Sequence, residues 1–204
     1  MKSNIILSGM AAVLVSVAGA NALEYRPFVG ATMGFQGGAY SDSAKDVERI
    51  AHIDFPTDFF MFGVETGVRA GGYNQIYNGG ITLSATKTTY SKIHNKYSEK
   101  TVANMDLLNL SVSYDNYIRI SGDKSSRIDL VLGAGFGTMA AHIDARGDGS
   151  DTYWSVAPEV KAGMDFELTQ NVTLSATGRV IIPTRSDYDF AVSYIIGGTV
   201  KYVF

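Results

Sequence analysis

Histidine, aspartate and serine are the side chains of this chain that could carry chemistry, and they are widely spaced. The histidines are His52, His94 and His142. Imidazole nitrogens bind metals and transfer protons, and His142 with Asp144 and Ser155 could form a hydrolytic site. However, no serine lies in a His-x-Ser or Gly-x-Ser-x-Gly pattern. We therefore expect solvated rim histidines, with no catalytic residue and no metal site.

A glycine-rich run, GAGFG at Gly133–Gly137, superficially suggests a nucleotide-binding loop. A phosphate-binding loop needs a following helix and a Lys-Ser/Thr pair, and neither follows here. The glycines instead occupy every second position, as in a strand. The chain also contains no cysteine, so it can form neither a disulfide nor a thiolate metal site. No cofactor is expected.

Composition places the chain among exported β-proteins. It has 204 residues, 46% of them apolar, with 22 glycines and 12 tyrosines. Its net charge of −3 comes without a basic stripe, so we expect no nucleic-acid partner. The length suits one domain.

The N-terminus has the form of a signal peptide. Lys2 precedes an apolar stretch from Ile5 to Val17, and Ala20-Asn21-Ala22 fits the A-x-A cleavage pattern. A membrane-anchoring helix is the alternative, but this apolar stretch is short. We predict a signal peptide over residues 1–22, cleavage between Ala22 and Leu23, and a single domain over residues 23–204.

Beyond the signal peptide, the dominant pattern is alternation of apolar and polar residues. Such a period of two indicates strands with two different faces. Strands of about ten residues are long enough to cross a bilayer at a tilt. Eight alternating segments run over residues 25–35, 60–69, 77–85, 108–119, 128–137, 154–168, 172–182 and 190–204.

The charges distinguish the two faces of these segments. The apolar face carries no charged residue, whereas the other face combines glycine, serine and threonine with nearly balanced charge. A soluble barrel or sandwich would turn the charged face outward, but this face lacks a dense Lys/Glu coat. We predict apolar side chains outward and polar ones inward, as in a membrane barrel. Because eight strands enclose a lumen that side chains can fill, we expect a paired lumen charge network of Arg26, Glu65, Arg69, Asp115, Arg119, Asp129, Glu159, Lys161, Asp165, Arg179 and Lys201.

The predicted connections alternate between long and short. Long loops are expected at Gly37–Asp58, Lys87–Asn104, Asp144–Asp151 and Pro183–Asp189, with short turns between them. In membrane barrels the long loops face outward from the cell and the turns face the periplasm. The first loop is acidic and the second is basic, through Lys87, Lys92, Lys96 and Lys100.

The chain resembles the small outer-membrane β-barrels of Gram-negative bacteria, of the opacity-protein and OmpA-like transmembrane type. The resemblance rests on the signal peptide ending ANA, the LVLGAGFG strand, residues Val160–Arg179 and the terminal Tyr202-Val203-Phe204. It implies that the barrel assembly machinery reads Val200, Tyr202 and Phe204 during insertion. It also implies contact with outer-membrane lipid and lipopolysaccharide.

The expected fold is therefore all-β, an eight-stranded antiparallel transmembrane up-and-down β-barrel in the bacterial outer membrane. We expect a lumen filled by side chains and a non-enzymatic role. Either the loops bind a host or matrix ligand, or the barrel is a structural protein of the membrane. A lipid A-modifying enzyme and a narrow-pore porin are the alternatives.

Overall fold

The computed structural model describes residues 24–72, 75–122, 126–145, 149–184 and 190–204. The predicted signal peptide and its cleavage site lie outside these residues. Eight antiparallel strands form a closed ring, in which the first strand pairs with the last and β6 pairs with β7. The ring strands are β1 (Tyr25–Tyr40), β3 (Asp58–Ala70), β4 (Tyr77–Thr88), β6 (Thr101–Ser121), β7 (Ile128–Ala145), β8 (Gly149–Glu167), β9 (Val172–Ile181) and β10 (Phe190–Val203).

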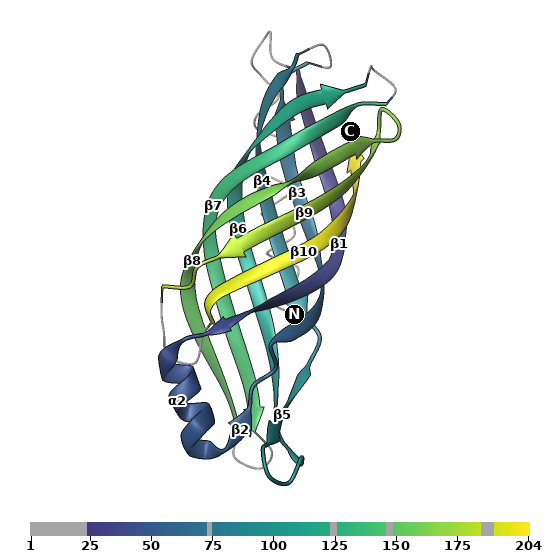
Figure 1. The fold of residues 1–204 in the computed structure, drawn as a ribbon. Coiled ribbons are helices and arrows are strands. Elements are labelled where there is room, and N and C mark those ends of the chain that lie inside the picture. Colours follow the sequence, from purple (N-terminus) through teal and green to yellow (C-terminus); the bar gives the residue numbers. More distant parts are fainter. Residues whose placement is uncertain (1–23, 73–74, 123–125, 146–148, 185–189) are drawn as a thin grey trace.

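Three further elements lie at one end of the ring. They are helix α2 (Asp42–Ala51) and the short strands β2 (Ile53–Asp54) and β5 (Ser91–Asn95), which pair with each other. Figure 1 places all three at the end opposite the C-terminus. We call this end the loop end, and the opposite end, where β3 joins β4, β6 joins β7 and β8 joins β9, the turn end.

The first two expected long loops are shorter and more structured than the sequence indicated. β1 continues to Tyr40, and β6 already begins at Thr101, so residues 37–40 and 101–104 belong to strands. β6, β7 and β8 contain 21, 18 and 19 residues, well beyond the roughly 9–11 that cross a bilayer. Their extra length rises past the apolar belt and supports α2 and β5.

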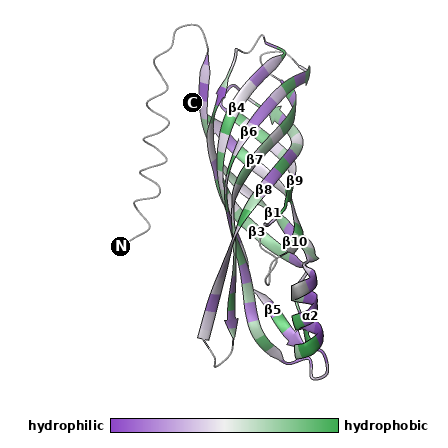
Figure 2. Cartoon of the chain, turned by 90° about the vertical axis from the view of Figure 1, so that its left-hand side faces the viewer, coloured by the Kyte–Doolittle hydropathy of each residue, from purple (hydrophilic) through white to green (hydrophobic). Residues whose placement is uncertain are grey.

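Alternation along the strands separates the inside of the ring from the outside. In β1, Arg26, Phe28 and Thr32 are buried, whereas Met33 and Phe35 are largely exposed. Figure 2 shows hydrophobic and hydrophilic residues alternating along the strands. No helix among the described residues is long and apolar enough to span a membrane.

Some inward positions require glycine because neighbouring backbone lies very close. A Cβ atom on Gly163 of β8 would lie 2.7 Å from Thr177 Cγ2 and closer still to the Ala176 carbonyl oxygen. A Cβ atom on Gly178 of β9 would have no neighbouring atom nearer than 3.9 Å. Of these two glycines, Gly163 is the one fixed by close packing.

We predict that Gly163→Ala lowers the free energy of unfolding by about 1–3 kcal/mol, because the added methyl group forces β8 and β9 apart. Urea unfolding in detergent micelles, followed by the gel mobility of the folded form, measures the change. Gly178→Ala is the matched control and should shift stability by less than about 0.5 kcal/mol. Equal losses in both variants would contradict the packing argument.

Candidate functional site

The turn half of the barrel interior holds a dense set of charges. Among the described residues, six bases and six acids that point inward are buried, and the two signs therefore balance. They are Arg26, Arg69, Arg127, Lys161, Arg179 and Lys201 with Glu65, Asp115, Asp129, Glu159, Asp165 and Glu167.

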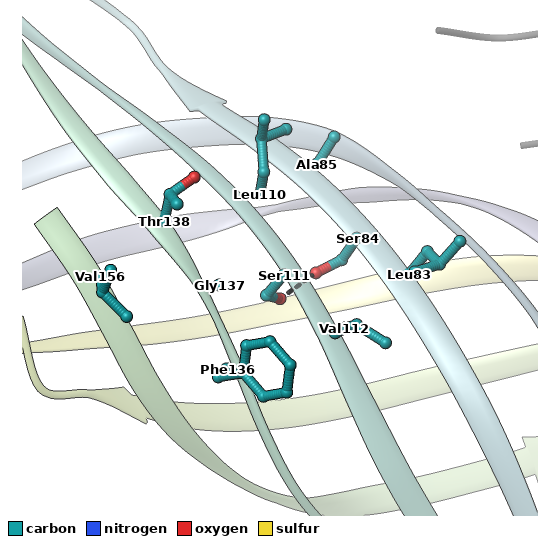
Figure 3. A pocket seen from close by; sticks show the side chains of 10 residues that line it. All are labelled: Leu83, Ser84, Ala85, Leu110, Ser111, Val112, Phe136, Gly137, Thr138 and Val156. Atoms are coloured by element: carbon teal, nitrogen blue, oxygen red, sulfur yellow. Dashed lines mark hydrogen bonds between the residues drawn. The ribbon is translucent and has the colours of Figure 1, made fainter. Parts of the chain in front are cut away.

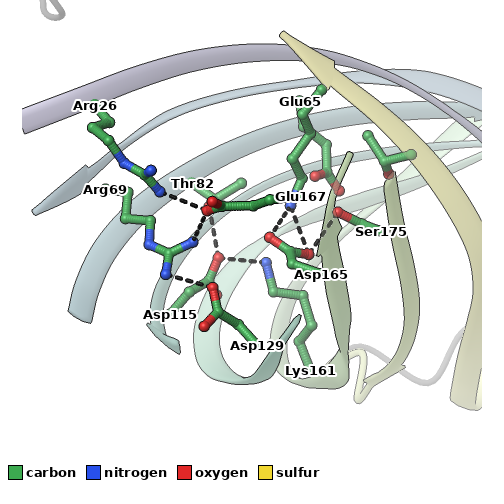
Figure 4. A network of polar contacts seen from close by, with 12 residues as sticks. Arg26, Glu65, Arg69, Thr82, Asp115, Asp129, Lys161, Asp165, Glu167 and Ser175 are labelled. Atoms are coloured by element: carbon green, nitrogen blue, oxygen red, sulfur yellow. Dashed lines mark hydrogen bonds and ion pairs between the residues drawn. The ribbon is translucent and has the colours of Figure 1, made fainter. Parts of the chain in front are cut away.

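Most of the ion pairs join these charges across the ring rather than along one strand (Figure 4). Arg69 bridges two acids, with its Nη2 atom 2.5 Å from Asp129 Oδ2 and its Nη1 atom 3.1 Å from Glu167 Oε1. Arg26 donates to the same Glu167 oxygen at 2.8 Å. The Arg69 guanidinium also lies 4.4 Å from the centre of the Tyr117 ring. This cluster joins β1, β3, β6, β7 and β8 near the turn end.

Two further ion pairs extend the set along the barrel. Lys161 Nζ lies 2.6 Å from Asp115 Oδ2, and Lys201 Nζ lies 3.2 Å from Asp165 Oδ2. Hydroxyl groups complete the coordination, since Thr82 donates to Asp115 at 2.6 Å. Buried charges need this combination of an opposite charge and additional hydrogen bonds to be tolerated.

Arg179 and Glu159 occupy the middle of the barrel. Arg179 pairs with Glu65 and donates to the Ser84 hydroxyl at 2.7 Å. Glu159 accepts a hydrogen bond from the Ser111 hydroxyl at 3.0 Å. Both side chains are buried, so polar contacts fill the lumen well beyond the turn-end cluster.

The predicted network and the observed one differ at their edges. Ten of the eleven predicted residues are buried, but Arg119, at the end of β6, is only half-buried. Sequence reasoning missed Arg127 and Glu167. Glu167 is simply the next inward position after Asp165, and Arg127 directly precedes β7, so extending the alternation by one step would have found both.

The loop half of the interior is apolar, although the alternation predicts a polar lumen throughout. Its side chains form one packed cluster between the polar middle of the lumen and the loop end. Members from the ring and its connections include Tyr40, Phe59, Met61, Ile93, Met105, Leu107 and Met139. Helix α2 packs onto this cluster through Ala44, which is fully buried.

Helix α2 is fixed at both ends. The Ser41 hydroxyl accepts from the Ala44 amide at 3.2 Å, a standard N-cap contact. His52 ends the helix in the left-handed conformation, with φ of 53°.

Burial, and secondarily the charge of Glu48, raise the pKa of the Tyr40 hydroxyl beneath the helix. Tyr40 therefore stays protonated and donates to the Pro56 carbonyl.

The possible hydrolytic site does not assemble. Ser155 points inward and is buried, whereas His142 and Asp144 lie on the outward face of β7. His142 contacts Thr152 instead, with Nδ1 3.0 Å from Oγ1. His52 lies beside Tyr97 at a ring-centre distance of 5.0 Å, and His94 belongs to β5. No cluster of three or more metal-ligating side chains occurs within the described part of the chain.

The C-terminal residues lie on the outer wall. Val200, Tyr202 and Phe204 are 55%, 49% and 69% exposed, so all three face away from the lumen. The Tyr202 and Phe204 rings pack edge to face at 5.1 Å. The Phe204 amide donates to the Pro27 carbonyl at 2.9 Å, which holds the last residue against β1.

Solved structures share this architecture. Neisserial surface protein A (NspA) aligns with 90% of this chain and 100% of its own, at 13% identity and a TM-score of 0.54. The N-terminal β-barrel domain of Pseudomonas aeruginosa OprF aligns with 90% and 100%, at 11% identity and a TM-score of 0.53. Ail, the attachment invasion locus protein of Yersinia pestis, aligns with 88% and 97%, at 17% identity and a TM-score of 0.50.

These similarities confirm the predicted fold, an eight-stranded antiparallel barrel of the type found in outer membranes. No protein-family model matches the chain, and no curated protein sequence matches it significantly.

The ion pair between Lys161 and Asp115 gives a direct test of the lumen network. Lys161→Met should lower the free energy of unfolding by about 3–5 kcal/mol, because Asp115 keeps a buried charge without its cation. Adding Asp115→Asn should recover part of this loss. Urea unfolding in lipid vesicles provides the measurement.

Lys45→Met is the control for this test, because the ion pair of Lys45 with Asp42 on α2 is exposed. It should change stability by less than about 0.5 kcal/mol. A Lys161→Met variant as stable as this control would show that the network is not a source of stability.

Proposed function

We propose that this protein is an integral outer-membrane β-barrel whose lumen is closed by its own side chains and whose activity lies on its loop-end surface. The proposal rests on the contrast between the outer face of the ring, which is apolar, and its inner face, which is charged. Large apolar side chains such as Met33, Phe62 and Phe136 are more than half exposed, while the buried charges face the lumen. A soluble protein rarely exposes an apolar surface of this extent, whereas lipid covers it.

Two features support a closed lumen. The turn half is occupied by paired charges, and the pocket between Arg26, Tyr117 and Lys201 has a volume of only about 10 Å³. The loop half is occupied by the apolar cluster beneath α2. These features argue against the narrow-pore alternative, because a conducting pore needs a continuous water-filled path.

Export and assembly follow from the same proposal. The signal peptide over residues 1–22 would direct the chain across the inner membrane. Val200, Tyr202 and Phe204 would then be read by the barrel assembly machinery. Their outward direction on the terminal strand supports this role, since a partner can reach them before the ring closes.

For the loop-end surface we propose binding of a host or matrix ligand that carries negative charge. Lys92 and Lys100 are exposed and form no ion pair with any described residue. On α2, by contrast, Lys45 and Arg49 each pair with an aspartate of the same helix. A structure of Ail holds the heparin analogue sucrose octasulfate, so one barrel of this fold accommodates a sulfated ligand.

Two alternatives to ligand binding have different support. A purely structural role in the membrane needs only the barrel and explains the strong lumen network equally well. A lipid A-modifying enzyme would need a catalytic group, and the separation of Ser155 from His142 removes the group considered from sequence.

Membrane insertion predicts a specific behaviour on gels. The protein should fractionate with the outer membrane, and unheated samples should migrate differently from boiled samples, because the closed barrel resists detergent. In planar bilayers we expect no large, stable conductance steps. Recovery in the soluble fraction would contradict membrane insertion, and stable conductance would contradict only the closed lumen.

The binding proposal predicts that Lys92→Ala with Lys100→Ala weakens attachment of expressing cells to heparin-coated surfaces by roughly tenfold, because two exposed charge contacts are lost. Higher ionic strength should weaken attachment of the unmodified protein as well. The matched control, Lys45→Ala with Arg49→Ala, should attach normally. Cells that attach no better than cells without the protein would favour the structural role.

A further inference from the structure

A polar cluster interrupts the outer wall of the barrel near the loop end. Lys87, Asp106, His142 and Thr152 all lie on the outward face, on β4, β6, β7 and β8 in ring order. Together with Tyr90 and Trp154 they line a hollow of about 220 Å³. The apolar belt therefore ends here in a site with both charge signs.

Asp106 is the unusual member of this cluster. Its side chain is only 4% exposed although it lies on the outer wall, and its Oδ2 atom lies 3.1 Å from Lys87 Nζ. Its Oδ1 atom is buried and has no hydrogen-bond partner within the described part of the chain. A buried acceptor without a donor is costly, so a donor from outside the protein is expected at this point.

Lys87 supplies the opposite charge on the exposed side of the hollow. Its side chain is 46% exposed, and the ammonium lies 5.5 Å from the centre of the Tyr90 ring. The ion pair with Asp106 fixes the ammonium of Lys87 at the edge of the hollow. His142 adds a second polar group, and its Nδ1 atom is already engaged by Thr152.

An apolar groove continues from the hollow along the same strands. Leu110, Thr138 and Val156 line the groove, each two positions beyond a residue that lines the hollow. Two positions along a strand correspond to about 7 Å on one face. The groove has a volume of about 530 Å³, and its lining is almost entirely apolar. Figure 3 shows Leu83, Leu110, Phe136 and Val156 around it.

We propose that the hollow and the groove together bind one molecule of a phosphorylated, N-acylated glycolipid of the lipid A class. An amide N–H or chain hydroxyl of the lipid donates to Asp106 Oδ1, a phosphate contacts Lys87 Nζ, and an acyl chain lies in the groove. This inference rests on the proposed membrane insertion, with the loop end facing the outer leaflet.

The charge arrangement favours this class over other membrane lipids. A primary ammonium head group would place a second cation beside Lys87. It would also bury several N–H groups, although among the described residues of the hollow Asp106 Oδ1 is the one acceptor available to them. A choline head group has no N–H to offer. A neutral amide or hydroxyl meets the need of Asp106 without adding charge, and the phosphate remains on the exposed side beside Lys87.

Trp154 provides the test, because it lines the hollow and is the single tryptophan of the chain. Full-length mature protein is reconstituted in bilayers of phosphatidylcholine with brominated acyl chains, which quench Trp154 fluorescence. Unbrominated lipid that displaces brominated lipid from the site restores the fluorescence. We expect lipid A to restore half of it at a mole fraction about fivefold lower than unbrominated phosphatidylcholine requires. One charge-assisted hydrogen bond to the site corresponds to at least a fivefold difference in affinity.

Variants assign the effect to the site. Asp106→Leu should abolish the preference for lipid A, whereas Asp144→Leu, on the outward face of β7 but outside the hollow, should keep it. Lys87→Met should reduce the preference, and Lys45→Met on α2, where the ion pair of Lys45 is exposed, should not. Gel mobility before and after heating verifies that each variant forms the barrel.

The opposing outcomes are distinct. Equal recovery with lipid A and phosphatidylcholine, or a full preference in Asp106→Leu, would overturn the site. Recovery by phosphatidylethanolamine as strong as by lipid A would overturn the neutral-donor assignment. Unquenched Trp154 in brominated bilayers, with identical mobility of heated and unheated protein, would instead overturn membrane insertion itself.

Discussion

Closure of eight strands into one ring constrains every other feature of this structure. A ring of this size leaves an interior that side chains can fill, and alternation forces half of each strand to point into it. Charges on that half can persist only if opposite charges meet them across the lumen. The equal numbers of inward-facing buried bases and acids, with Arg69 bridging Asp129 and Glu167, are the consequence. Because these contacts connect strands that are distant in sequence, they form only when the ring is complete.

The two halves of the interior are filled by different kinds of side chain. Near the turn end, ion pairs stabilise the lumen, whereas near the loop end Met61, Met105 and Met139 form an apolar cluster. The apolar cluster lies inside the ring, while outward neighbours of its members, such as Phe60 and Phe62 beside Met61, are apolar and exposed. This second core explains how a ten-residue helix such as α2 is held at a barrel rim, because Ala44 of the helix packs onto a surface that the strands have already built.

The sequence predicts the ring well because its signal is repeated. Eight alternating segments, each long enough to cross a bilayer, define the fold, and ten of the eleven lumen residues predicted from them are buried. The ends of the strands and the connections between them were less predictable. Phe59 and Phe60 are adjacent and both apolar, so alternation does not distinguish inward from outward there, although only Phe59 is fully buried. Helix α2 was not predicted from the sequence, because its position depends on contacts with the apolar cluster that no local pattern encodes.

The same limitation affects the outer wall. Within the eight predicted segments the apolar face carries no charge, and this regularity supports a lipid-facing surface. Lys87 and Asp106 lie two positions beyond those segments, on strands that continue further than expected, and so break the rule on the same face. An exposed lysine at the edge of the belt could simply extend into water. Asp106 cannot, because it is buried with one oxygen lacking a donor. The outward face changes from apolar to charged at Lys87 and Asp106. This position is therefore where the outer wall is best suited to recognise a particular lipid.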